Sequence, residues 1–106
     1  MWIVSFVSEA ALSEVEALPR DLRAKLTRIV ALIEASGLAA LRPPYVKHLE
    51  GKFWEIRLAG NSGIARSIYV TASGERVVVL RTFVKKTQKT PRREIDLAHD
   101  RARSVR

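Results

Sequence analysis

Hydrophobic residues recur along the chain at helical and at strand spacing, and these spacings divide it into seven predicted elements. The β-branched and aromatic run WIVSFV at residues 2–7 predicts a first strand. Apolar residues three and four positions apart then predict two helices, from Ser8 to about Leu18 and from Asp21 to about Ser36. Pro19 stops the first helix and Gly37 ends the second, so we expect a helical hairpin.

The second half of the chain is dominated by strand-forming residues. Three segments of this kind follow the break at Pro43-Pro44, at residues 46–58, 64–72 and 75–84. Turns containing glycine separate them, at residues 60–63 and at Ser73-Gly74, which predicts two antiparallel hairpins. A C-terminal helix is expected to follow, with Thr90 as N-cap and Pro91 at the first helical position.

The predicted order of elements is β-α-α-β-β-β-α. A chain of 106 residues is long enough for one hydrophobic core, so we expect a single domain over residues 1–106. Elements in this order are typical of an α+β fold, here with a mostly antiparallel sheet and with the helices on one face. The other face of the sheet is then open to solvent.

Three arginines come together when the predicted hairpins are drawn out. A loop at residues 60–63 places Arg57 opposite Arg66, and a two-residue loop at Ser73-Gly74 places Arg66 opposite Arg81. Because side chains alternate along a strand, three more residues share this face: Glu55, Phe83 and Lys85. Like charges directly opposite each other destabilise a sheet, so the row indicates an anion site, such as one for a phosphate. A register slip of one residue would instead scatter the arginines over both faces as solvated side chains.

The positive charge of the chain rises toward its C-terminus. The sequence has 19 Lys and Arg against 11 Asp and Glu, a net charge of +8, and residues 81–106 hold nine of the basic and three of the acidic side chains. This asymmetry is typical of a surface that binds a polyanion, and an acidic protein would be attracted equally well. Charge alone also allows a solvated basic tail without a partner.

Several kinds of chemistry have no support in the sequence. The chain has no cysteine for a disulfide or a thiolate metal site, and His48 and His99 stand alone without a nearby carboxylate at useful spacing. We therefore expect no metal and no cofactor. No apolar run approaches the roughly 20 residues that span a bilayer, and the N-terminus has no basic segment before its hydrophobic stretch. A cytoplasmic protein is expected.

One set of residues resembles a known family. It comprises Lys47 and Leu49 before a turn, the stretch FWEIRL, the pair Arg66 and Tyr69, and the run TFVKKTQKTPRREI leading into the terminal helix. Together they resemble the phage-derived, HigB-like group of the RelE superfamily, the toxins of type II toxin-antitoxin systems. The resemblance covers nearly the whole chain, and the run FVKKTQKTP with an upstream WEIR is its specific part.

The resemblance implies a compact RelE-type fold and a toxin that is an endoribonuclease, an mRNA interferase that typically cuts messenger RNA in the ribosomal A site. It also implies a cognate antitoxin, usually a helix-turn-helix protein of the HigA type, through which the toxin meets DNA only indirectly. The chemistry we expect is metal-free transesterification, in which the RNA 2′-hydroxyl attacks the adjacent phosphodiester.

Carried over to this sequence, the resemblance assigns roles to individual residues. Arg57 and Arg66 match the arginines of the active-site strands and are expected to hold the phosphate. Lys85 and Lys86 match the basic pair after the last strand, and Lys47 matches a lysine often implicated in substrate contact. From the residues themselves, Lys85 is the first candidate for general base or acid and Lys47 the second, and Glu55 is expected to orient Arg57. Phe83 is expected to stack on a base, and the full set of further RNA-binding residues is Arg81, Phe83, Lys86, Lys89, Arg92 and Arg93.

The sequence departs from the best-known RelE enzymes at two points. Glu55 stands where those enzymes carry a second lysine, two residues before the strand arginine, and their C-terminal tyrosine is absent from the region of Arg101 to Arg103. The identity of the general base is therefore not carried over. An alternative prediction is a non-catalytic, basic nucleic-acid-binding module, or an inactive toxin homologue that acts through a protein partner.

Overall fold

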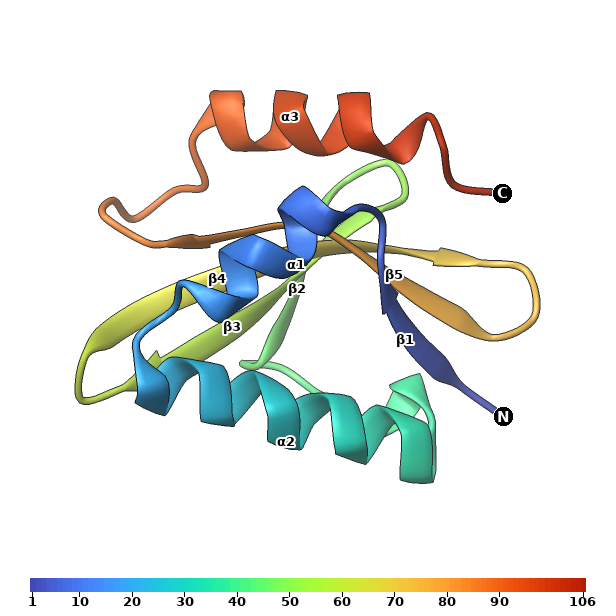
Figure 1. The fold of residues 1–106 in the computed structure, drawn as a ribbon, viewed down its shortest axis with the longest axis horizontal. Helices are drawn as coiled ribbons and strands as arrows, with labels where there is room; N and C mark the ends of the chain where they lie inside the picture. The colour runs from blue at the N-terminus through green and yellow to red at the C-terminus, as the bar shows by residue number, and fades with distance from the viewer.

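Five strands form one sheet, with helices on both of its sides (Figure 1). The computed structural model describes all 106 residues. In chain order the elements are β1 (Ile3–Phe6), α1 (Glu9–Glu16), α2 (Arg20–Ser36), the short 3-10 helix η1 (Leu38–Ala40), β2 (Val46–Glu50), β3 (Phe53–Gly60), β4 (Gly63–Ala72), β5 (Arg76–Val84) and α3 (Arg92–Ala102). The strand order is β1-β5-β4-β3-β2, with β1 parallel to β5 and the other neighbours antiparallel. The predicted α+β class and the mostly antiparallel sheet are confirmed.

The helical hairpin begins and ends close to the predicted residues. Ser8 caps α1, since its hydroxyl accepts a hydrogen bond from the Ala11 N–H at 3.2 Å. Pro19 is the N-cap of α2, and Gly37 ends that helix with a φ of 87°, a conformation that glycine adopts at little cost. None of the helices is long and apolar enough to span a membrane.

The hairpin buries its apolar stripe on one face of the sheet, as predicted. Leu22, Leu26 and Ile33 of α2 are almost completely buried there, together with Val15 and Leu18 near α1. The sheet contributes alternate residues of its strands to this first core: Ile56, Leu58, Ala65, Tyr69 and Val77. Burial of this apolar surface is the main force that holds the hairpin on the sheet.

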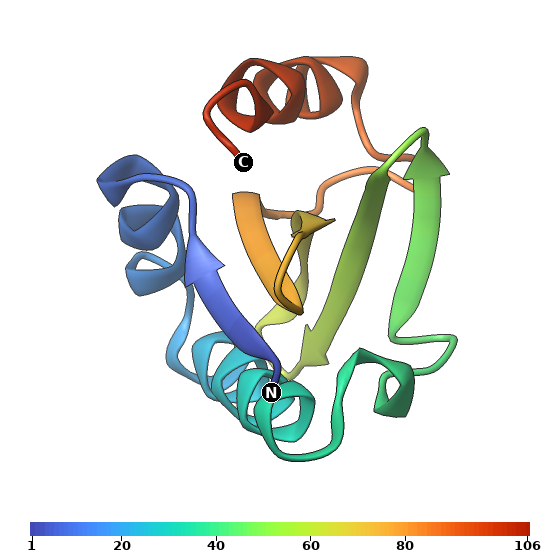
Figure 2. The same ribbon diagram turned by 90° about the vertical axis from the view of Figure 1, so that its right-hand side faces the viewer.

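The opposite face of the sheet is not open, which corrects the prediction that the helices lie on one face only. Figures 1 and 2 show α3 on the side of the strands opposite to α2. Ala98 of α3 is fully buried in a second core whose other buried members are Phe53, Ile68, Val70, Val78, Leu80 and Phe83. The central strands β4 and β5 are apolar on both faces, so both faces need a cover.

The predicted strand at residues 46–58 is in fact two strands. The chain turns at Gly51-Lys52, where Gly51 has a φ of 53°, and β3 folds back antiparallel to β2. This adds one strand to the predicted order. The turn carries no run of turn-forming residues, and its single glycine is the only local signal.

The register of the sheet agrees with the prediction at one hairpin and differs at the other. Arg57 lies opposite Arg66, as predicted. Between β4 and β5 the turn takes three residues, Ser73 to Glu75, and Leu80 forms a bulge, so Phe83 and not Arg81 lies opposite Arg66. The predicted row of three arginines is therefore a pair.

Candidate functional site

The arginine pair of β3 and β4 lies in a cleft at the end of the sheet face that α3 leaves uncovered. This cleft has a volume of about 410 Å³, and we call it the Arg57–Arg66 cleft. Its lining is mostly polar and comes from Pro44, Val46, Lys47, Glu55, Arg57, Arg66, Lys85 and Gln88. All four residues predicted to be catalytic, Arg57, Arg66, Lys85 and Lys47, are among them.

Three strands and the segment that follows β5 bring these side chains together. Lys47 of β2 is paired with Glu55 of β3, so its side chain enters the cleft from the sheet edge. Lys85 directly follows β5, and its backbone N–H donates to the Ile64 carbonyl at 2.7 Å, which fixes it beside β4. Residues spread over almost forty positions of sequence thus surround one small space.

The electrostatics of the cleft favour proton transfer by Lys85. Loss of hydration lowers the pKa of its ammonium, and the positive charges of Arg66 and Arg57 lower it further, with Glu55 opposing. The neutral amine, which can accept a proton, is therefore more available here than on an ordinary lysine.

Arg66 is held rigidly by its neighbours. Its side chain is buried, and Nη1 lies 3.3 Å from Glu55 Oε1 and donates to Thr90 Oγ1 at 2.5 Å. Nη2 donates to the Gln88 carbonyl at 2.8 Å, and the Thr90 hydroxyl donates to Glu55 Oε2 at 2.7 Å. Glu55 therefore orients Arg66, which corrects the prediction that it orients Arg57.

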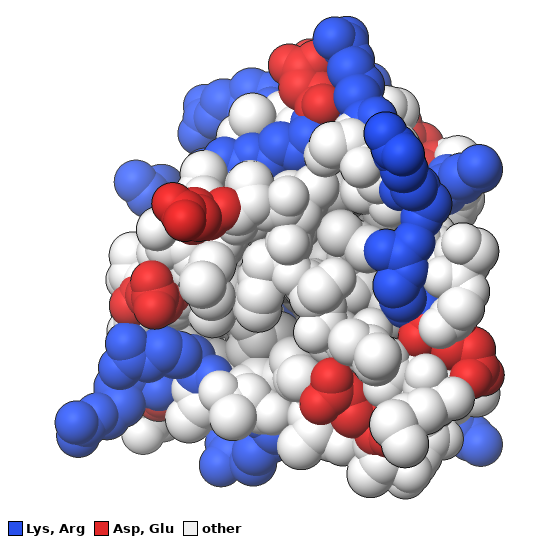
Figure 3. Space-filling model, turned by 45° about the vertical axis from the view of Figure 1, so that its right-hand side comes forward, with Lys and Arg blue, Asp and Glu red and all other residues white.

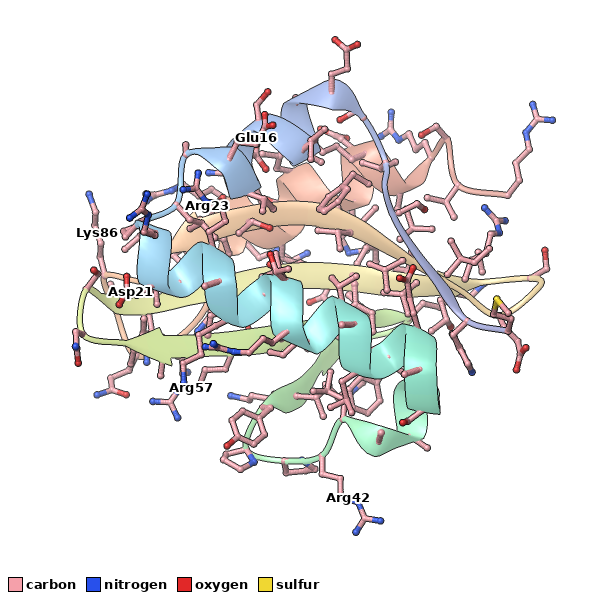
Figure 4. All side chains as sticks on the ribbon, turned by 60° about the horizontal axis from the view of Figure 1, so that its bottom comes forward. Glu16, Asp21, Arg23, Arg42, Arg57 and Lys86 are labelled. Atoms are coloured by element: carbon pink, nitrogen blue, oxygen red, sulfur yellow. The ribbon has the colours of Figure 1, made fainter.

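Arg57 has the opposite character. Its side chain is exposed and makes no hydrogen bond or ion pair, and Figure 4 shows it projecting outward from β3. All five of its N–H donors are free to bind an anion at the mouth of the cleft.

Several predicted RNA-binding residues lie elsewhere or are already engaged. Arg81 forms ion pairs with Glu14 at 2.7 Å and Glu94 at 2.8 Å. Phe83 packs in the second core, and the guanidinium carbon of Arg81 lies 5.9 Å from the centre of its ring. Both side chains lie on the predicted face of the sheet, but α3 covers this part of it, so neither joins the Arg57–Arg66 cleft.

The basic residues after β5 divide between two sides of the segment that leads to α3. Lys86 and Arg93 line a separate cleft together with Arg81. Lys89 is exposed and lines neither cleft. Arg92 binds both carboxylate oxygens of Glu50, at 2.6 and 3.1 Å, and is not free for RNA. On the face drawn in Figure 3, Lys and Arg side chains and several Asp and Glu side chains lie around a middle region of uncharged residues.

Sequence reasoning missed three residues that line the cleft, Pro44, Val46 and Gln88, and the role of Thr90 behind it, and it misjudged one histidine. Gln88 lines the cleft, and Thr90, predicted only as a helix cap, joins Arg66 to Glu55, while Pro91 is the N-cap of α3. His99 lies 2.9 Å from Glu50, a carboxylate 49 positions away that sequence spacing does not show. No three His, Cys, Asp or Glu side chains come together as a set that could hold a metal ion.

Comparisons with known proteins agree with this architecture. The family profile described as Phage derived protein Gp49-like (DUF891) matches residues 13–103. The structure is similar to that of the E. coli toxin RelE, solved as a double arginine-to-alanine mutant in the free state, with a TM-score of 0.66. The two share 19% sequence identity over 94% of this chain and 96% of that chain. No curated protein sequence gives a significant match.

The profile covers most of the chain and the structural likeness extends over nearly all of it, so both support the superfamily that the sequence motifs resemble. The chain belongs to the Gp49-like family of phage-derived proteins and has the fold of the RelE toxins.

Proposed function

We propose that this chain is the toxin of a type II toxin-antitoxin system and a metal-independent endoribonuclease that cleaves messenger RNA. The observation that carries the proposal is the meeting of Lys85 and Lys47 with the paired Arg57 and Arg66 in one open cleft. Four cations around one buried carboxylate leave an excess of positive charge, and a phosphodiester would neutralise part of it.

In the proposed reaction, Arg57 binds the scissile phosphate, because its donors are free and it lies at the cleft mouth. Arg66 adds a fixed positive charge beneath the phosphate, since its neighbours hold it in place. Both charges stabilise the phosphorane-like transition state more than the ground state, because negative charge grows on the phosphoryl oxygens.

The proton transfers fall to the lysines. Lys85 accepts the proton of the 2′-hydroxyl while the 2′-oxygen forms its bond to phosphorus. The bond from phosphorus to the 5′-oxygen breaks, and that oxygen takes a proton from Lys47. The products are a 2′,3′-cyclic phosphate and a 5′-hydroxyl, and DNA is resistant because it lacks the nucleophile.

The test of this function uses an RNA oligonucleotide and the same oligonucleotide with one 2′-deoxy nucleotide at the cleavage site. We expect cleavage of the first with a 2′,3′-cyclic phosphate end and none of the second at that site. Arg57→Ala is expected to slow cleavage about 100-fold or more, and Lys52→Ala, an exposed lysine outside the cleft, should have no effect. Cleavage at the deoxy position, or equal rates for Arg57→Ala and the unchanged protein, would disprove the mechanism.

The cellular setting is part of the same proposal. Members of toxin-antitoxin families act with an antitoxin, and we propose a HigA-like helix-turn-helix partner, cytoplasmic action and cleavage in the ribosomal A site. Mapping messenger RNA ends with and without added ribosomes decides ribosome dependence. Cleavage of free RNA at an equal rate would remove the ribosome from the proposal.

A further inference from the structure

A second groove lies beside the Arg57–Arg66 cleft, between α2 and the segment from η1 to β3, and the proposed chemistry does not use it. Its volume is about 460 Å³. Its apolar lining consists of Ile29, Leu32, Ala40, Leu41, Tyr45, Leu58 and Ala59. Leu32 is 41% and Tyr45 58% exposed, so the groove holds apolar surface in contact with water. We call it the α2 groove.

Four cations and no carboxylate line the α2 groove. They are Lys25, Arg28, Arg42 and Arg57. None of the four makes an ion pair or a side-chain hydrogen bond in the structure, whereas Arg81, Arg92 and Arg101 elsewhere are each paired with acidic residues. In Figure 4, Arg42 and Arg57 both project outward below α2. This gathering of free positive charge around apolar surface calls for a ligand that is both anionic and apolar.

The groove wall formed by α2 has a regular spacing. Lys25, Arg28, Ile29 and Leu32 lie at positions i, i+3, i+4 and i+7, which form one stripe about two turns long on a helix. This stripe adjoins the one that is buried on the sheet, since Ile29 also packs against the first core, while Lys25, Arg28 and Leu32 are exposed beside it. Two cations followed by two aliphatic side chains on this stripe match a helical segment that offers carboxylates beside aliphatic side chains.

We propose that the α2 groove binds an acidic protein segment with aliphatic side chains, supplied by the antitoxin. This inference rests on the toxin-antitoxin part of the proposed function. The lining favours protein over RNA, because six of its seven apolar residues are aliphatic and only Tyr45 offers a ring on which a base can stack. Leucine or isoleucine side chains of the segment pack against the apolar lining of the groove, and its carboxylates form ion pairs with the four cations.

The position of the groove links this binding to catalysis. Arg57 lines both the α2 groove and the Arg57–Arg66 cleft. A carboxylate that binds Arg57 from the groove therefore competes with an RNA phosphate in the cleft. The partner can inhibit the enzyme in this way without covering Lys85.

The experiment uses a synthetic helical peptide with Leu at positions i, i+3, i+4 and i+7 and Glu between them, titrated into the full-length protein. Two control peptides carry Lys in place of Glu or Ser in place of Leu. Backbone amide shifts in NMR spectra locate the binding site. We expect saturable shifts at Ile29, Leu32 and Leu58 with the acidic Leu peptide only, and inhibition of RNA cleavage at the same concentrations.

Variants of the protein separate the groove from the cleft. Leu32→Asp and Arg28→Glu are expected to weaken peptide binding about tenfold or more, while Lys52→Glu, on the β2–β3 turn, leaves it unchanged. Leu32→Asp should cleave a short RNA at the normal rate. The inference would be overturned if millimolar peptide gave no saturable binding, or if the shifts lay outside the groove. It would also be overturned if a non-cleavable 2′-O-methyl RNA, and not the peptide, shifted the groove amides. Peptide binding without any RNA cleavage would support the peptide site in the α2 groove and refute only the proposed nuclease activity.

Discussion

At the scale of single residues, the cleft depends on a buried trio of Glu55, Arg66 and Thr90. Glu55 is 2% and Arg66 6% exposed, so neither charge has water to stabilise it and each needs the other. Thr90 is the link, because its hydroxyl accepts from Arg66 and donates to Glu55. The trio also ties the segment that carries Lys85 and Gln88 onto the sheet.

Thr90→Val removes this link and keeps the shape of the side chain. We expect the variant to lose about 2 kcal/mol of unfolding free energy, since one donor and one acceptor of charged groups lose their partner. RNA cleavage should slow about tenfold, because Lys85 is no longer held beside Arg66. Thr90→Ser restores the hydroxyl and should be close to the unchanged protein in both measurements. Equal cleavage rates for the Val and Ser variants would remove Thr90 from the site.

Under the proposed mechanism, the pH dependence of cleavage is set by Lys85. Loss of hydration and the charges of Arg66 and Arg57 hold the pKa of Lys85 below the usual 10.5, so the neutral base appears at lower pH than for an ordinary lysine. The cleavage rate should therefore rise with pH and level off below pH 10.5. Arg57→Gln removes one positive neighbour, raises the pKa of Lys85 and moves the plateau to higher pH, although the maximal rate falls. A plateau that moves to lower pH, or does not move, contradicts the role of Lys85 as base.

At the scale of elements, the edge of β5 needs protection that β1 does not provide. β1 pairs only with the part of β5 from Arg76 to Val79. Beyond it, the Thr82 N–H donates to Glu14 of α1 at 3.2 Å, and the Leu80 carbonyl accepts from Arg101 of α3 at 2.9 Å. Side chains from two helices thus satisfy backbone groups that would otherwise be an open strand edge.

Glu14 is the centre of this arrangement, because it also binds Arg101 through two hydrogen bonds of 2.8 Å and pairs with Arg81. Glu14→Ala is expected to lower the unfolding free energy by about 3 kcal/mol, since it removes a carboxylate partner from two partly buried arginines and leaves the Thr82 N–H without its acceptor. Glu16→Ala, on the same helix but exposed and without an ion pair, should change it by less than about 0.5 kcal/mol. Urea unfolding of the three proteins measures the difference, and equal effects of the two substitutions would show that Glu14 has no special role.

At the scale of the whole molecule, the fold decides which of the many cations are available to a ligand. Helices cover both faces of the sheet and not one, and each face has its own core. The helix α3 pairs Arg81 of β5 with its own Glu94, and its Arg92 pairs with Glu50 of β2. The uncovered end of the sheet keeps cations without acidic partners in and around two adjoining hollows: Lys25, Arg28, Arg42, Lys47, Arg57 and Lys85. These six cations therefore form one region of positive charge where the cleft and the α2 groove meet.

Local sequence determined the parts of the protein in which a residue acts on its near neighbours. Helix caps and breakers at Ser8, Pro19 and Gly37 set the hairpin, and the turn at residues 60–63 set the pairing of Arg57 with Arg66, because hairpin register follows from loop length. The tertiary structure alone decided the bulge at Leu80, the cover of the second face by α3 and the partners of the remaining charges. Each of these depends on contacts between residues far apart in the chain, such as Glu14 with Arg101, whose energies no local pattern contains.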